Sequence, residues 1–131
     1  IIAVPDEKRT YANTAAALDN LGSLSNAVTV GGIISTLDLV HPDQAIRDAA
    51  RDAVKQIQNF FIDNVSSNRE LYNGFKYYAE NNAPHEELSA EQHYYIEETL
   101  KDFKRSGLDL PDDKLEALKK IKKESIQAKN L

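Results

Sequence analysis

The sequence predicts an all-α fold, an antiparallel helical bundle of about five helices in one domain that covers residues 1–131. Apolar residues recur at steps of three and four along most of the chain, which is the period of one helix face. The four prolines fall between these periodic segments and never inside one. No segment shows β-strand alternation with turn residues at both ends, although β-branched residues cluster between Ala27 and Ile34.

The first helix is expected to run from about Tyr11 toward Leu37, with Thr10 as its N-cap. Three apolar residues recur on one face of this helix: Leu18, Leu21 and Val28. Three glycines weaken the helix and are expected to bend or split it: Gly22, Gly31 and Gly32.

The second helix is expected to begin after His41-Pro42, with Asp43 as its cap. Its apolar residues follow at steps of four, three, four and three: Ile46, Ala50, Ala53, Ile57 and Phe60. Charged residues occupy its other sides: Arg47, Asp48, Arg51, Asp52 and Lys55. This pattern is typical of an amphipathic helix with one buried face.

Two further helices are expected between Asn68 and Gly107. One runs from about Asn68 to Glu80, with three residues pointing inward: Leu71, Phe75 and Tyr78. The next opens at Ser89, where Gln92 can complete a capping box. Its inward stripe is expected to contain His93, Ile96, Leu100 and Phe103. Gly107 is placed to be its left-handed C-cap.

The last helix is expected to begin at Asp112 or Asp113, after an extended connection that ends at Pro111. Residues 114–131 contain six lysines and two glutamates, although the whole chain has a net charge of −5. A basic segment raises the alternative of nucleic-acid binding. The lysines, however, alternate with apolar residues at helical spacing, and no aromatic residue is interleaved for base stacking. We therefore expect a solvated helix face and no nucleic-acid partner.

The residues that catalysis or metal binding would require are not spaced for either. The segment that starts at His85 begins like the H-E-x-x-H helix of a zinc peptidase, but Ser89 stands in place of the second histidine. His41 is expected in a loop, and His93 is expected to be a partly buried packing residue. The chain has no cysteine. We therefore predict no catalytic residue and no metal ligand in this segment.

The aromatic residues are denser than a bundle surface needs, and six of them fall within two short stretches: Tyr72, Phe75, Tyr77, Tyr78, Tyr94 and Tyr95. Tyr77 or Tyr94 is expected to face outward, where tyrosines can mark a recognition surface. The alternative is a set of half-buried tyrosines with hydrated hydroxyls. No individual substrate-binding residue is assigned. No apolar stretch approaches the roughly 20 residues of a membrane span, so no membrane contact is expected.

Several blocks, in the right order, resemble the N-terminal region of thimet-oligopeptidase-type zinc metallopeptidases, a family that includes neurolysin, saccharolysin and oligopeptidase A. The first block runs from Thr10 to Thr14, the second from Ile46 to Ala50, and the third from Arg69 to Tyr72. The longest runs from Tyr95 to Pro111 and ends in a Gly-Leu-x-Leu-Pro connector. The resemblance extends over about residues 4–131.

This resemblance implies a neurolysin-like N-terminal helical domain that forms one wall of a channel for short peptides. Zinc would be held by an H-E-x-x-H helix in the catalytic domain of the same parent chain, so this segment alone is expected to be inactive. The segment is expected to be truncated at both ends, to self-associate weakly, and to come from a cytoplasmic enzyme, or from a mitochondrial or other intracellular one. The alternative function is a stand-alone helical protein-interaction module.

Overall fold

The computed structural model describes residues 1–23 and 25–129, with side chains described outside 22–29. This part of the chain contains six α-helices and no strand, so the predicted all-α fold class is confirmed. The helices are α1 (Ala15–Ser23), α2 (Ser25–Val40), α3 (Gln44–Phe61), α4 (Arg69–Tyr77), α5 (Ala90–Arg105) and α6 (Asp112–Lys129). The predicted first helix corresponds to α1 and α2, and the other four predicted helices correspond to α3 to α6.

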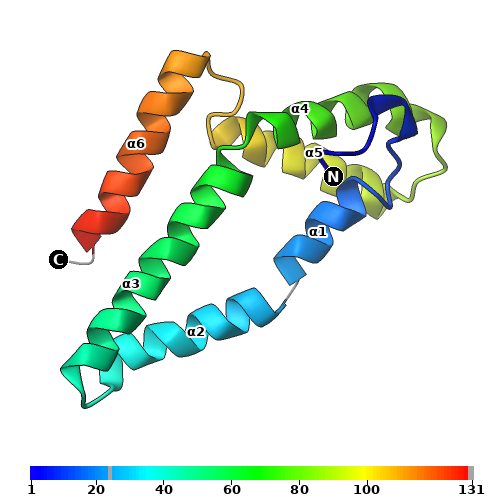
Figure 1. Cartoon of the computed structure of the whole chain (residues 1–131). Helices are drawn as coiled ribbons and strands as arrows, with labels where there is room; N and C mark the ends of the chain where they lie inside the picture. The colour runs from blue at the N-terminus through cyan, green and yellow to red at the C-terminus, as the bar shows by residue number, and fades with distance from the viewer. Residues whose placement is uncertain (24, 130–131) are drawn as a thin grey trace.

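The helices form a long hairpin joined to a smaller packed group (Figure 1). α2 and α3 are antiparallel neighbours linked by a short loop, and they diverge away from that loop. α4 and α5 pack against each other at the far end of α3. α6 then returns along α3 in the antiparallel direction. Short loops join α2 to α3 and α5 to α6, as expected for an antiparallel helical fold, whereas the longer segment 78–89 joins α4 to α5.

The hydrophobic core lies where α4, α5 and the start of α6 meet α1. Phe75 and Tyr78 are fully buried there, as predicted, and Leu71 is nearly so. The ring of Phe103 stands edge-on to two aromatic rings of α4, with centroids 5.6 Å from Phe75 and 5.9 Å from Tyr72. Such pairs add about 0.5–1.5 kcal/mol beyond the burial of their area. The core therefore fixes α5 against α4.

The predicted helix ends are confirmed at three caps. Asp43 accepts a hydrogen bond from the backbone N–H of Ala45 (2.8 Å) at the start of α3. Ser89 and Gln92 form the reciprocal capping box of α5, with bonds of 3.2 and 2.9 Å. Gly107, at φ +91°, ends the same helix in the left-handed conformation. α6 begins at Asp112, one of the two predicted residues.

The beginning of the first helix differs from the prediction. Thr10 does accept a hydrogen bond from the backbone N–H of Asn13 (3.3 Å), but α1 begins at Ala15. Residues 11–14 form a turn instead. The backbone N–H of Tyr11 donates to the carboxylate of Glu86, so a distant side chain adds to the local bonds between Thr10 and Asn13 that hold this turn. A cap motif read from the sequence could not include that contact.

The apolar faces of α1, α2 and α3 are only partly covered. Leu18 packs against the core, whereas Leu21, from the same predicted apolar face, is 47% exposed. On α3 only Ala50 is buried, while Ile46 and Phe60 at the two ends of the predicted stripe are exposed. The core lies around α4 and α5, so it does not reach these positions. Val28, the third residue of that predicted face, and Gly22, which was expected to weaken the helix, lie outside the residues whose side chains are described.

α2 is helical through the segment where β-branched residues cluster, and it continues through both Gly31 and Gly32. Two π-helical segments, Ile62–Ser66 and Tyr78–Asn82, follow α3 and α4 and were not predicted. Among the described residues, no helix combines the length and the apolar character needed to cross a membrane.

Candidate functional site

The N-terminal segment, residues 1–11, is held against α4 by the side chain of Arg9. Its Nε donates to Asp6 (2.7 Å), and its Nη1 donates to the carbonyl oxygen of Ile1 (3.0 Å). The side chain is only 5% exposed, so its charge is balanced by Asp6 in a largely dry position. The guanidinium lies directly over Gly74, where a Cβ would stand 2.6 Å from Nη2. The position of Arg9 therefore requires a residue without a side chain on α4.

Two further contacts tie this segment to the residues that follow α4. The side-chain amide of Asn82 donates to the carbonyl oxygens of Asp6 (2.8 Å) and Arg9 (2.9 Å). The backbone N–H of Tyr11 lies 3.1 and 3.2 Å from the two carboxylate oxygens of Glu86. The bonded residues are more than 70 positions apart in the sequence. These bonds therefore hold the N-terminal residues against the segment that follows α4.

A concave surface of about 500 Å³ opens beside Arg9, and we refer to it as the Arg9 concavity. It is lined by Ile2, Asp6, Arg9, Glu70, Asn73, Gly74 and Tyr77. It presents carboxylates, an amide and the ring of Tyr77, which is 38% exposed. These groups can hydrogen-bond a polar chain and stack against an apolar side chain. Tyr94 on α5 is 65% exposed, so both tyrosines predicted as candidates for an outward position do face outward.

Three tyrosines, the buried Tyr78 and the half-buried Tyr11 and Tyr95, have raised pKa values. Burial, together with the neighbouring Glu86 carboxylate, raises the pKa of Tyr78 well above its ordinary value. No hydrogen bond of ordinary geometry reaches the Tyr78 hydroxyl. Burial, with the charge of Asp19, also raises the pKa of Tyr11 and Tyr95. These groups therefore remain neutral at physiological pH and are poorly suited to act as general bases.

The three histidines lie in separate parts of the structure. His41 is in the loop between α2 and α3, where its Nδ1 accepts a hydrogen bond from the N–H of Asp43 (3.1 Å). His85 is exposed at the end of a 3-10 turn (Ala83–His85), as predicted for a surface loop. His93 is exposed, so its prediction as a partly buried residue is wrong. It lies in the first turn of α5, whereas the burial of that helix begins at Ile96.

Ser89, which stands where a zinc peptidase would need its second histidine, is the N-cap of α5. In the part of the chain that the structure describes, no group of three or more histidine or carboxylate side chains could hold a metal ion. That this segment contains neither catalytic residues nor metal ligands stays a prediction, and the structure does not assign substrate-binding residues.

Sequence reasoning missed Arg9, Glu86 and Gly74, which build the concavity and its attachment. An isolated glycine within a helical pattern often marks a close approach of another group, so Gly74 was the available signal. Arg9 and Glu86 gave no comparable signal, because their partners are distant in sequence.

Comparison with known proteins gives two relatives. The chain is 34% identical over 127 residues to a thimet-like oligopeptidase from Dictyostelium discoideum, a match that covers 92% of this chain and 18% of the relative. It is 32% identical over 95 residues to a mitochondrial intermediate peptidase from Malassezia globosa, covering 70% of this chain and 11% of the relative. No protein-family model matches the chain, and no solved structure matches it.

The two relatives carry peptidase names, and the first aligns with nearly all of this chain. The family resemblance seen in the ordered sequence blocks is thereby confirmed. The chain spans less than a fifth of the length of either relative. It is therefore related to peptidases of the thimet-oligopeptidase type and corresponds to only a small part of them.

Proposed function

We propose that this chain is the non-catalytic, N-terminal helical domain of a zinc-dependent oligopeptidase and forms one wall of its substrate channel. The observation that carries the proposal is the 34% identity to a thimet-like oligopeptidase across 92% of this chain. Under this proposal the catalytic domain of the same parent chain holds the zinc ion and cleaves the peptide. This segment contributes shape and restricts the size of the substrate.

The structure supports this division of roles in two ways. The aromatic core between α4 and α5 gives a firm support for a surface. The three histidines are placed in a hairpin loop, a 3-10 turn and the first turn of α5, and none belongs to a metal-binding group within the described residues. A channel wall requires a well-packed core beneath its surface. It does not require histidines placed to bind a metal ion.

We further propose that the Arg9 concavity touches the bound peptide. Tyr77 offers an exposed ring, and polar groups follow on the same helix, Asn73 about one turn away and Glu70 about two turns away. Such a mixture suits a short peptide, whose backbone needs hydrogen-bond partners and whose side chains need apolar contact. The catalytic domain and short peptides are therefore the partners that we propose.

The test uses the full-length parent protein and a short fluorogenic peptide. We expect chelator-sensitive cleavage of the peptide and no cleavage of a folded protein of similar sequence content. Tyr77→Ala should raise KM severalfold with little change in kcat, because a contact made equally in ground and transition states affects binding alone. Tyr94→Ala, at an exposed tyrosine outside the concavity, is the matched control.

A full-length parent without peptidase activity would overturn the proposed function. Equal KM values for Tyr77→Ala and Tyr94→Ala would overturn the peptide contact and leave the channel wall standing.

A further inference from the structure

α2 carries an apolar face that the described part of the chain leaves uncovered. Four residues on it are exposed at steps of three, four and three, which places them on one side of the helix. They are Val30 (49% exposed), Ile33 (57%), Leu37 (36%) and Val40 (70%). We refer to these four residues as the α2 face. A contiguous exposed apolar stripe on a folded protein marks a contact surface.

The charge pattern of the hairpin separates this face from the solvent side. α2 contains one charged residue, Asp38, which pairs with Arg51 of α3 at 2.9 Å. α3 instead exposes charged residues such as Asp48 and Asp52. A helix that is apolar around most of its circumference is typically covered on more than one side. Within the hairpin, α2 is thus nearly uncharged and α3 carries most of the exposed charge.

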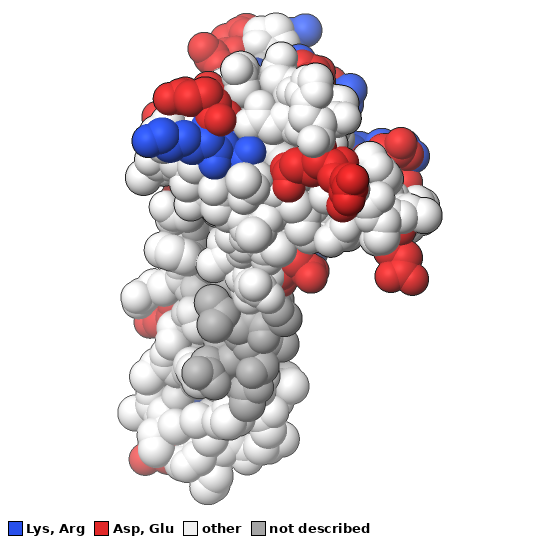
Figure 2. Space-filling view, turned by 90° about the vertical axis from the view of Figure 1, so that its right-hand side faces the viewer, with Lys and Arg blue, Asp and Glu red and all other residues white. Residues whose placement is uncertain are grey.

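Figure 2 shows the same contrast on the molecular surface. Charged side chains gather over the upper part of the molecule, where α4, α5 and the N-terminal segment lie. The surface over the lower part of α2, beyond the residues drawn in grey, is almost free of them. A partner that covers this region would remove few charges from water, so its docking would carry little desolvation cost.

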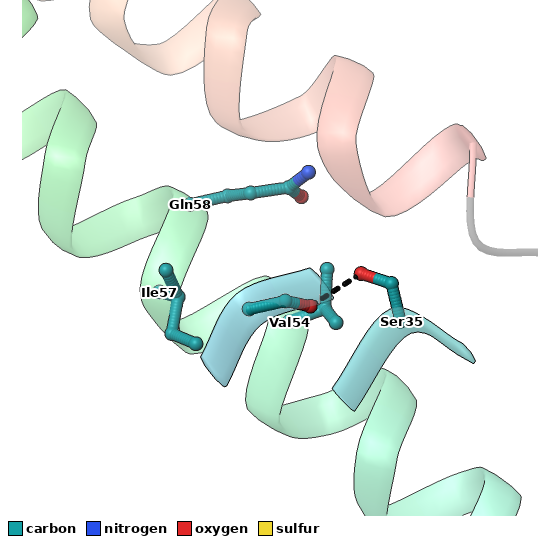
Figure 3. Close-up of a pocket in the computed structure, with 5 residues that line it drawn as sticks. Ser35, Val54, Ile57 and Gln58 are labelled. Atoms are coloured by element: carbon teal, nitrogen blue, oxygen red, sulfur yellow. Dashed lines mark hydrogen bonds between the residues drawn. The ribbon is translucent and has the colours of Figure 1, made fainter. Parts of the chain in front are cut away.

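A separate groove lies on another side of α2, where that helix contacts α3. It has a volume of about 150 Å³ and lies between α2 and α3, lined by Gly31, Ser35, Val54, Ile57 and Gln58 (Figure 3). The Ser35 hydroxyl already donates to the carbonyl oxygen of Gly31 (2.8 Å). A Cβ built on Gly31 would meet nothing within 4 Å, so the groove has open space at that point.

We propose that the α2 face is the docking surface for the remaining part of the full-length parent protein, which packs an apolar surface of its own against it. This proposal rests on the proposed function in one respect, because it takes this chain to be one part of a longer parent protein. The proposal is supported by the length of the two relatives. The match to this chain covers only 18% of the first relative and 11% of the second. Most of each relative is therefore available as the covering partner, and the uncharged face requires an apolar one.

Thiol labelling in the full-length parent tests the proposal directly. This chain has no cysteine, so Ile33→Cys introduces a single thiol into it on the α2 face. Leu37→Cys is a second variant on the same face, and Asp52→Cys, on the charged side of α3, is the matched control. The rate of maleimide labelling is read for each site by mass spectrometry of its peptide, in native protein and in denaturant.

We expect labelling at positions 33 and 37 to be slowed by at least about 100-fold on folding, because a covered site reacts only through opening of the contact. Labelling at position 52 should slow by less than about tenfold, because an exposed site reacts without any opening of the structure. The protection at 33 and 37 should persist on dilution, since the partner belongs to the same chain. Rates at 33 and 37 that match the rate at 52 would overturn the proposal. Protection that disappears on dilution would also overturn it, because the partner would then be a second copy.

The same preparations separate the two proposals. Protection at residue 33 in a parent that cleaves no peptide would sink the proposed function and leave the docking surface standing. Peptide cleavage by a parent in which Cys at position 33 is labelled as fast as in denaturant would contradict the docking surface and leave the proposed function standing.

Discussion

The guanidinium of Arg9 lies across Gly74, so close that a Cβ on Gly74 would stand 2.6 Å from Nη2 and 2.8 Å from Cζ. Arg9 cannot move aside without disturbing its bonds to Asp6 and to the carbonyl oxygen of Ile1. The N-terminal segment and α4 are therefore fitted to each other at one glycine. The Arg9 concavity depends on this fit.

Gly74→Ala is expected to destabilise the protein by about 1–2 kcal/mol, because the cost of overpacking exceeds the gain in helix propensity. Gly32→Ala is the matched control, since its Cβ meets nothing within 4 Å. That change should stabilise α2 by up to about 1 kcal/mol. Urea unfolding measures both, and equal effects of the two substitutions would show that the Arg9 contact is not tight.

Asp63 should attach α6 to the end of α3 in a pH-dependent manner. Its carboxylate lies 2.8 Å from the ammonium group of Lys123 and 3.2 Å from that of Lys119. The hydrogen bond from Lys123, which outweighs the effect of burial, lowers the pKa of Asp63. A lowered folded-state pKa contributes stability above the unfolded pKa of about 3.9, and this stability is lost as pH falls through the folded value.

Asp63→Asn should therefore reduce the free energy of unfolding near neutral pH by less than about 1 kcal/mol, because the site is partly exposed. The difference from the unmodified protein should shrink below about pH 4 and in about 1 M salt. Asp109→Asn, in the exposed connection before α6, is the control. A difference that is constant with pH and salt would contradict the proposed electrostatic attachment.

Tyr78 should make the fold sensitive to alkali. Its pKa is raised in the folded protein, so the folded state holds this proton more firmly than the unfolded chain. Stability is then fully present below the unfolded pKa of about 10 and falls as pH rises above it. Tyr78→Phe should change stability by no more than about 1 kcal/mol near neutral pH, because the hydroxyl has no ordinary hydrogen bond to lose.

The same substitution should weaken the loss of stability between about pH 10 and 12, measured by circular dichroism. Tyr94→Phe, at an exposed position, should leave that alkaline loss unchanged. An identical alkaline transition in Tyr78→Phe and the unmodified protein would argue against Tyr78 as its source.

Ser89→Ala should destabilise the protein by about 1 kcal/mol, because it removes the capping box that begins α5. Ser125→Ala, at an exposed position within α6, should change stability by less than about 0.5 kcal/mol. Thermal unfolding of both variants measures the difference. A loss as small as that of Ser125→Ala would mean that the cap contributes nothing to the stability of α5.

The sequence was sufficient where local chemistry determines structure. Asp43 and Ser89 cap the helices that they were expected to cap, and Gly107 takes the predicted left-handed conformation. Phe75 and Tyr78 are buried as the periodicity indicated. These features depend on residues within a few positions of one another, so one sequence contains the information.

The sequence was insufficient where a distant residue decides. Glu86 helps to hold the turn at Tyr11, and Arg9 requires Gly74, although each pair is more than 60 residues apart. The periodicity of α3 correctly indicated an amphipathic helix, but it could not show that Phe60 remains exposed in this chain. Periodicity reports which face prefers burial and does not report what covers it.

The central claim is that this helical chain contributes structure and no catalysis to a peptidase. It is tested most directly by elemental analysis for zinc at neutral pH, combined with a chelator-controlled assay of peptide cleavage. We predict no stoichiometric zinc and no cleavage for the isolated chain, and chelator-sensitive cleavage of the same peptide by the full-length parent. One zinc ion per isolated chain, with cleavage that a chelator abolishes, would contradict the account.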